Sequence, residues 1–324
     1  MIRRIYVRAL RHTRSAFWRD ASAVEGSVML HVLPLVLTFG AIACAIAYID
    51  WNEKLPNLKI EVTAFELLGA ALGALLVLRT NEGIGRWTEG RKLWGGITNQ
   101  SRNIVAAGLA YGPDDEAWRR SLVRWTIVFA HACRRSLRAE RAIPEIVELV
   151  GEDEARRVAE AEHMPGHVSL VLGRILRVAV DRLGMDRFMF LQIDQERMAL
   201  IDHIGGCERI SKTPLPRAYA IQIRQLLFAF LVVLPCGLIK QVGYWYTPLL
   251  TMVVAYPLLA LDRIGAELQR PFLKSSLSHL DLDGITTTIE RNLLGLLDGP
   301  AGDVEVDVLL VEDEVGATPP APSA

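Results

Sequence analysis

Long apolar blocks alternate with charged stretches along this chain. The first block covers 27–49 and has no charged residue between Glu25 and Asp50, and the second covers 62–78 with one acid, Glu66, near its start. About 20 apolar residues are needed for a helix that crosses a hydrocarbon core of about 30 Å. The second block is short for a span, but its helical pattern continues past Leu78. We therefore predict a first membrane helix and a longer second helix that leaves the bilayer.

The third and fourth blocks form a predicted helical hairpin. The third begins near Ala218 and is continuously apolar over 226–239, and the fourth has no charged residue over 241–261. The aromatic residues Tyr244, Trp245 and Tyr246 follow the turn at 241–243, and such side chains favour the membrane interface. Two alternatives remain less favoured: a signal peptide for the first block, and a soluble protein with buried helices.

Basic residues predict the orientation. The segment before the first block carries Arg3, Arg4, Arg8, Arg11, Arg14 and Arg19, whereas the loop over 50–61 has only Lys54 and Lys59 as basic residues. Past the second block come Arg79, Arg86, Arg91 and Lys92. By the positive-inside rule, both termini and the large central segment face the cytoplasm.

The central part, about 100–215, is polar and predicts helices without strands. An apolar stripe over 115–139 indicates an amphipathic helix, and a second stretch begins at Pro144 and ends at Pro165-Gly166. Two more helices are expected over 167–183 and 186–210. Their arginine-rich faces fit either solvated helix surfaces or a vestibule that attracts ions. The tail after Gly299 is acidic and then rich in Pro, Ala and Ser, which predicts disorder, with a short strand at 304–308 as an alternative.

Composition and motifs narrow the function. Among 324 residues, 36 Lys and Arg face 37 Asp and Glu, and the net charge of -1 gives no support for nucleic-acid binding. The four cysteines lack metal-ligand spacing, so we expect no metal site and no cofactor. Catalytic motifs such as H-E-x-x-H, G-x-S-x-G and a Walker loop are absent, which favours a conduit or scaffold over an enzyme.

Three segments resemble bestrophins in the same order. The region after their second span is matched by Arg79-Thr80-Asn81, Arg86-Trp87, Glu89-Gly90-Arg91, Trp94-Gly95, Asn99 and Ser101-Arg102-Asn103. The stretch before their third span is matched by Gly206-Cys207-Glu208-Arg209-Ile210 and Thr213-Pro214-Leu215-Pro216. The bacterial members' region after the fourth span is matched by Glu267-Leu268, Pro271-Phe272, Leu280, Leu282-Asp283, Thr288-Ile289-Glu290 and Asn292-Leu293. Together the resemblance covers about residues 10–298.

The resemblance implies an all-α homopentamer in the bacterial inner membrane, with one axial ion pore lined by the second membrane helix. It implies a channel for small monovalent ions, nominally chloride, since most animal members conduct chloride while some bacterial members prefer cations. The alternatives are a cation-selective channel of the same fold and a non-conducting membrane scaffold. A secondary transporter is less favoured, because the two hairpins show no internal repeat. The expected partners are further copies of the chain, the lipid bilayer and the permeant ions.

The resemblance also places pore residues. Matching residue by residue puts Ala70, Ala74 and Leu78 at the membrane neck, which would be wide, and Phe188 at a lower cytoplasmic constriction. Glu66, one helical turn outside Ala70, would form a ring of carboxylates at the outer mouth, and such rings attract cations. Small residues that serve only helix packing are the alternative for the neck. Arg79 would oppose Glu66 if it pointed inward.

Two further expectations follow from the same comparison. The segment 273–278 after Pro271-Phe272 lacks the acids that bind calcium in animal members, so we expect no calcium clasp. The chain divides into a cytoplasmic N-terminal helix (1–26), the first two membrane helices (27–95), a helical cytoplasmic domain (96–215), the last two membrane helices (216–262), a C-terminal segment (263–299) and a tail (300–324).

Overall fold

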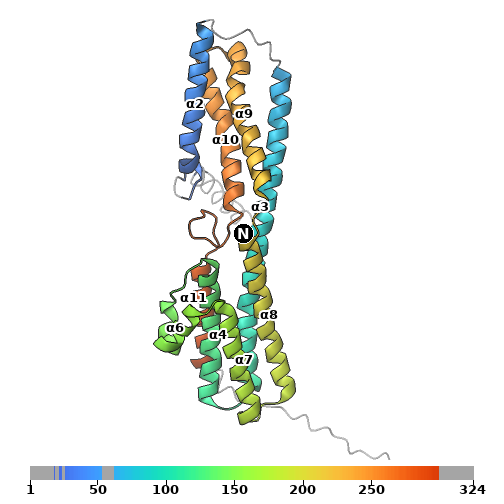
Figure 1. Cartoon of the computed structure of the whole chain (residues 1–324), viewed down its shortest axis with the longest axis vertical. Helices are drawn as coiled ribbons and strands as arrows, with labels where there is room; N and C mark the ends of the chain where they lie inside the picture. Colours follow the sequence, from blue (N-terminus) through green and yellow to red (C-terminus); the bar gives the residue numbers. More distant parts are fainter. Residues whose placement is uncertain (1–17, 19–21, 24–25, 53–61, 299–324) are drawn as a thin grey trace, which may run out of the picture.

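The computed structural model describes residues 18, 22, 23, 26–52 and 62–298. Within these residues the chain is all helical and has no strand, as the sequence predicts. The helices form two bundles stacked end to end along one axis (Figure 1). The helix predicted over 1–26 and the tail after Gly299, including the alternative strand at 304–308, lie almost wholly outside the described residues.

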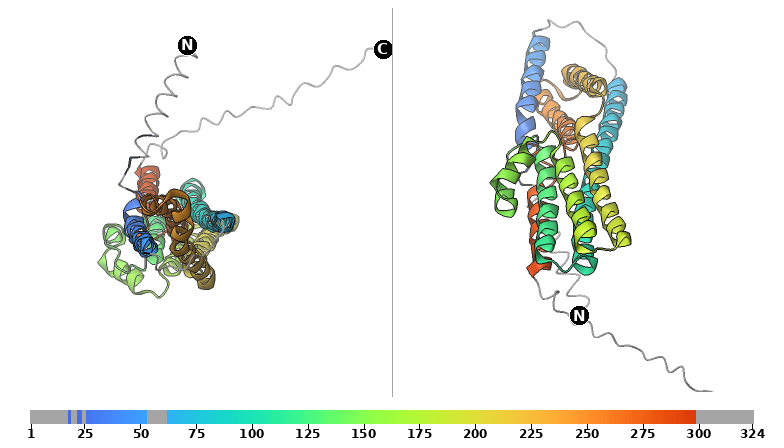
Figure 2. Two further views of the ribbon diagram at one scale, coloured as in Figure 1. Left: turned by 90° about the horizontal axis from the view of Figure 1, so that it is seen from above. Right: turned by 60° about the horizontal axis from the view of Figure 1, so that its bottom comes forward.

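The first unit, the membrane bundle, contains the apolar helices. It consists of α2 (Met29–Trp51), the first part of α3 (Val62–Tyr111), α9 (Arg217–Val242) and α10 (Thr247–Glu267). These are four helices long and apolar enough to cross a membrane, which confirms the four predicted spans. Helix α10 packs against α2, α3 and α9, and α2 lies on the far side of α9 and α10 from α3 (Figures 1 and 2). Their shared core is made by Val32, Val36, Phe39, Phe65, Leu72, Leu227, Phe230, Leu231, Leu234, Ala255 and Leu259.

The second unit, the polar bundle, is built on the continuation of α3. Against α3 pack α4 (Glu116–Leu137), α8 (Arg187–Lys212) and α11 (Leu282–Asp298), and α7 (Met164–Leu183) packs against α4 and α8. The short helices η1 (Pro144–Ile146), α5 (Val147–Val150) and α6 (Glu152–Glu160) lie at one side (Figure 1). A large apolar core joins them, including Trp94, Phe129, Leu172 and Ile204. The predicted stripe of α4 faces this core, because amphipathic helices bury their apolar face.

Local signals set the ends of these helices. Asp115 caps α4 by accepting a hydrogen bond from the Trp118 amide at 2.7 Å, and Asp186 caps α8 through the Phe188 amide at 2.8 Å. Helix α7 ends at Gly184, whose φ of 71° suits glycine. The chain therefore begins and ends its helices where short polar residues and glycine stand.

Two helix boundaries differ from the sequence interpretation. Helix α3 runs without a break through residue 95 to Tyr111, about 75 Å at 1.5 Å per residue, so the division drawn at 95 falls inside it. Pro165-Gly166 does not end a helix but stands in the first turn of α7. Proline is well accommodated there because its missing amide is not needed, and the His163 side chain accepts from the Gly166 amide at 3.0 Å.

Candidate functional site: the open face of helix α3

One face of α3 is exposed along the whole helix, and we call it the open face. With 3.6 residues per turn, positions spaced by three, four or seven lie on one stripe. The exposed residues on or directly beside this stripe include Glu66, Ala70, Ala74, Val77, Leu78, Asn81, Ile84, Gly85, Arg91, Lys92, Gly95, Asn99, Arg102 and Ala106. No element of the described chain covers this stripe.

The opposite face of α3 packs into the membrane bundle. Leu72 is 4% exposed, Leu76 is 0% exposed and Arg79 is 2% exposed. Arg79 is nine residues from Ala70 and hence lies about 180° around the helix axis from it, at about 100° per residue. The packing of α3 against α9 and α10 therefore leaves the open face pointing away from the rest of the bundle.

The residues predicted for a neck share this open face. Ala70, Ala74 and Leu78 are exposed, and Leu78 is accompanied by Val77, which is 50% exposed. Val77 stands two helical turns from Ala70, a spacing that could have identified it in the sequence. Along the apolar section of the open face, two small alanines are thus followed by the larger side chains of a valine and a leucine.

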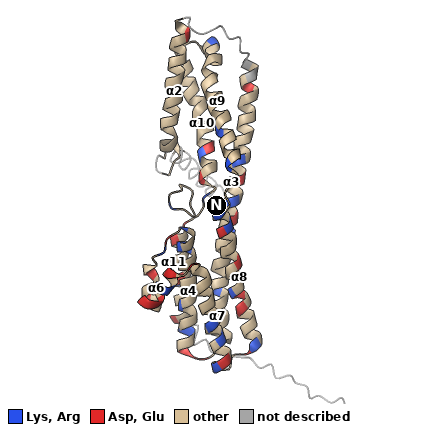
Figure 3. Ribbon diagram, in the orientation of Figure 1, with Lys and Arg blue, Asp and Glu red and all other residues tan. Residues whose placement is uncertain are grey.

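The charge along the open face changes sign on either side of this apolar section. Glu66 is exposed at the outer end, whereas Arg91, Lys92 and Arg102 are exposed further along α3. Lys92 stands about 21 Å beyond Leu78 at 1.5 Å per residue. These three cations form no ion pair among the described residues, and the Arg91 guanidinium lies 5.9 Å from the centre of the Trp87 ring. Figure 3 shows that charged residues are sparse in the membrane bundle and frequent below it.

Arg79 does not belong to the open face. Its guanidinium donates to the carboxylate of Asp262 on α10, inside the membrane bundle. The same carboxylate accepts from Nε of Arg224 on α9 at 3.1 Å. The sequence left open whether Arg79 points inward, and the packing directs it to the other side of α3.

Phe188 lies in the first turn of α8, and its side chain is 77% exposed. Helix α8 runs antiparallel to α3, since Asn103 donates to Glu196 at 3.1 Å and Arg86 donates to the Ile210 carbonyl. This register sets Phe188 level with the end of α3, at the end of the polar bundle far from the membrane helices (Figure 1). Phe188 therefore lies near the C-terminal end of α3, whereas the neck residues lie near its N-terminal end.

The segment after Phe272 folds over an arginine network. Arg134 and Arg138 of α4 donate to one carboxylate oxygen of Asp283 at 2.7 and 2.8 Å, and Lys274 Nζ lies 3.3 Å from the other. The Arg138 hydrogen bond holds the pKa of Asp283 well below its usual range. Among the described residues no group of three or more His, Cys, Asp or Glu could hold a metal ion. Asp283, the acid that Lys274 of this segment contacts, is thus engaged by cationic side chains.

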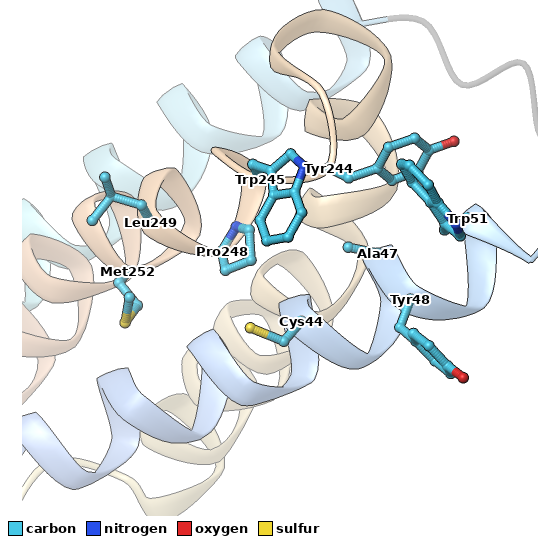
Figure 4. Close-up of a pocket in the computed structure, with 9 residues that line it drawn as sticks. All are labelled: Cys44, Ala47, Tyr48, Trp51, Tyr244, Trp245, Pro248, Leu249 and Met252. Carbon is cyan, nitrogen blue, oxygen red and sulfur yellow. The ribbon is translucent and has the colours of Figure 1, made fainter.

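An apolar groove of about 540 Å³ lies at the outer end of the membrane bundle, between α2 and α10 (Figure 4). Trp51 and Tyr244 meet edge to face there with ring centres 5.1 Å apart, and Trp245 is 87% exposed. Tyr244 and Trp245 stand at the turn where the sequence predicts interfacial aromatic residues, and Trp51 is the last residue of α2. The groove is on the α2 side of the bundle and is separate from the open face.

These features define a multi-pass membrane protein in which one helix continues from the bilayer into a helical domain. The model of the family described as Bacterial/Fungal Bestrophin protein matches residues 9–295, and the chain belongs to the bestrophin family.

Two similar proteins carry the name voltage-dependent anion channel-forming protein. One, from Mesorhizobium japonicum, is 33% identical over 276 residues, covering 85% of this chain and 87% of the relative. The other, from Escherichia coli K12, is 29% identical over 275 residues, covering 85% of this chain and 89% of the relative. A crystal structure of a bacterial bestrophin homologue from Klebsiella pneumoniae matches with a TM-score of 0.75 and 26% identity, covering 83% of this chain and 98% of that chain.

Proposed function

We propose that five copies of this chain form an anion channel whose central pore is lined by the open face of α3. The observation that carries this proposal is the open face itself, an uncovered stripe that runs from one bundle through the other. Five copies of the chain around a common axis would enclose this stripe along the whole helix, which is what a pore-lining helix requires. Ala70, Ala74, Val77 and Leu78 then form the neck, Glu66 the outer mouth and Phe188 a lower constriction.

The basic section of the open face supports anion conduction. Rings of charged side chains select ions of the opposite sign, and arginine and lysine rings suit anions. Five copies of Arg91, Lys92 and Arg102 would make the wide part of the pathway strongly positive. The names of the relatives from M. japonicum and E. coli agree with this choice.

Glu66 is the observation that favours a second candidate, a cation-selective channel of the same fold. Its ring would stand at the outer mouth, before the neck, and would concentrate cations there. Only charges close to the pathway matter, because screening acts within about 8 Å at physiological salt. The two candidates therefore differ in which ring stands closer to the ions at the narrowest passage.

The orientation in the bilayer follows from the flanking charges. The arginines before the first span and those after the second support an orientation with the polar bundle in the cytoplasm of a bacterial cell, beneath the inner membrane. On this orientation ions from outside meet Glu66 first, then the neck, then the basic section. Nothing in this route requires catalysis, and we assign no enzymatic role.

The test is the reversal potential of the purified protein in planar bilayers under a potassium chloride gradient. An anion channel reverses near the equilibrium potential of chloride, and the double variant Lys92→Gln/Arg102→Gln moves the reversal toward that of potassium. Arg177→Gln on α7 removes the same kind of charge away from α3 and serves as the matched control.

Other results would replace the proposal. A wild-type reversal near the potassium potential that Glu66→Gln moves toward chloride would establish the cation-selective alternative. The absence of unitary currents from protein that has inserted and assembled would establish the non-conducting scaffold.

A further inference from the structure

A buried ion pair joins the pore-lining helix to the rest of the membrane bundle. Arg79 of α3 is 2% exposed and donates to Asp262 of α10, which is 8% exposed. Asp262 also accepts from Arg224 of α9, whose side chain is 57% exposed. One carboxylate thus connects three membrane helices, directly after Leu78 at the end of the neck.

Toward its N-terminal end, α3 contacts the membrane bundle through apolar side chains. Toward its outer end Phe65 packs against Gly237 of α9, where an added Cβ would lie 2.6 Å from the ring. Leu72 and Leu76 complete the buried face. Apolar packing is non-directional, whereas a charge-assisted hydrogen bond from a planar guanidinium fixes direction. The bond to Asp262 therefore specifies which way α3 is turned.

A close contact between backbones stands one turn below the ion pair. A Cβ added to Gly83 would lie 3.0 Å from Cβ of Leu268 and 3.2 Å from the carbonyl oxygen of Gly265. Gly265 in turn would place a Cβ 3.5 Å from Cγ of Arg79. Helices approach this closely only where both partners are small. This contact restrains the position of α3 along its axis relative to α10. The ion pair restrains the rotation of α3 about that axis.

We propose that Arg79, through Asp262, is the positioning residue that holds Ala70 and Ala74 toward the pore. The proposal rests on the proposed function, since it takes the open face as the pore lining. The sequence shows what the alternative would be, because a turn of α3 by one residue, about 100°, would replace Ala74 with Leu75 on the pathway. The rotation that Arg79 sets therefore decides whether the neck presents alanine or leucine.

Thiol accessibility tests the rotation directly. In a Cys44→Ser/Cys236→Ser background, Ala74→Cys and Leu75→Cys are introduced singly and treated with charged methanethiosulfonates, anionic and cationic in parallel. We expect Ala74→Cys to react at least tenfold faster than Leu75→Cys. With Arg79→Gln/Asp262→Asn added, which removes both charges and leaves a polar amide at each position, this ratio falls toward one or inverts.

Two further variants keep the result decisive. Arg224→Gln removes the exposed arm of the bridge, and the ratio stays as in the background protein. If the double variant fails to assemble, Arg79→Lys is used instead; it keeps the charge but loses the planar guanidinium, and a lowered ratio supports the proposal.

An unchanged ratio in an assembled Arg79 variant overturns the positioning role and leaves the proposed channel intact. Failure of the proposed function would give another result. If Ala74→Cys in the background protein reacts no faster than Leu75→Cys, and its modification leaves the current unchanged, then α3 does not line a pore. That result overturns the proposed function and this inference with it.

Discussion

The two bundles of this protein use opposite arrangements of the same residue types. In the membrane bundle apolar side chains cover both the inside and the outside, and Arg79 and Asp262 form a buried ion pair between two helices. In the polar bundle the core is apolar, the surface is charged, and the buried arginines of α4 are held by carboxylates. Helix α3 passes through both environments without a break.

This difference changes what sets the orientation of a helix. In water an amphipathic helix is turned by its own apolar stripe, because exposing that stripe costs free energy. In a bilayer both faces are apolar, so hydrophobicity cannot choose between them, and packing and polar contacts must. Helix α4 is an example of the first case and the membrane part of α3 of the second.

The largest effect we expect comes from filling the neck. Ala74→Phe would place five aromatic rings at one level of a pentamer, and apolar constrictions close by dewetting. Unitary conductance in planar bilayers should fall by more than tenfold. Val253→Phe, on an exposed face of α10, adds the same ring away from the open face. Equal conductance loss in the two variants would contradict the assignment of the pore lining.

In the polar bundle the corresponding change is the loss of Asp283. Asp283→Asn leaves the buried guanidinium of Arg138 without its charged partner, while Arg134 keeps Glu145 at 2.6 Å. We expect a loss of about 1–3 kcal/mol in the free energy of unfolding. We expect no larger loss in the free energy of unfolding, because the Asp283 side chain is 41% exposed and solvent screens its ion pairs.

Thermal unfolding of the detergent-solubilised protein, followed by tryptophan fluorescence, measures this loss as a lower Tm. Asp298→Asn at the other end of α11 is the matched control. An acid near a helix C-terminus is unfavourable to the helix dipole, so its removal should not lower Tm. A drop of equal size in both variants would show that the network around Asp283 adds nothing specific.

The same difference between the bundles explains which structural features the sequence could predict. The four spans follow from the apolar blocks, and α4, α7 and α8 follow from apolar periodicity and local helix signals; the structure confirms these elements. The single helical stretch predicted from Pro144 is divided into η1, α5 and α6. The helical spacing of Val77 from Ala70 could have placed it on the open face, but the direction of Arg79 could not be fixed in this way. That direction depends on which side of α3 packs against α10, and the partner Asp262 stands 183 positions away in the chain.

The helix boundaries show a further limit of local signals. Pro165-Gly166 is typical of a helix end, but the cap supplied by His163 makes it a helix start. The sequence predicts that the second helix continues past Leu78, but no local signal shows that it runs across the division drawn at 95 to Tyr111. The assignment of Ala70, Ala74, Leu78, Glu66 and Phe188 to a pathway stays a prediction that the experiments above decide.

A smaller effect is expected from pH, through His131 of α4. Burial lowers the pKa of this imidazole, with Arg134 acting in the same direction and Glu290, at 3.0 Å, and Glu145 opposing it. The folded protein therefore binds this proton less readily than the unfolded chain. Stability from this group is complete above the unfolded pKa of about 6.5 and is lost as the pH falls below it.

His131→Gln should make the fall of Tm between pH 7 and pH 5 shallower than in the wild type. The difference in slope cannot exceed about 1.4 kcal/mol per pH unit for one proton. Above pH 8 the difference in Tm between the two proteins should be constant, which serves as the internal control. A steeper fall in the variant would reverse the sign and show that the contact with Glu290 outweighs burial.

The smallest effect concerns an ion pair on the surface of the polar bundle. Glu116 and Arg120 form an i,i+4 pair in α4, with side chains 75% and 53% exposed. Such pairs contribute about 0.3–0.5 kcal/mol. A double-mutant cycle with Glu116→Gln and Arg120→Gln should give a coupling of this size. Glu116→Gln should cost more than Arg120→Gln, because Glu116 also stands in the first turn, where acids favour the helix dipole. A coupling above about 1 kcal/mol would mean that another copy of the chain covers this end of α4 in the assembly, since exposed pairs do not reach that value.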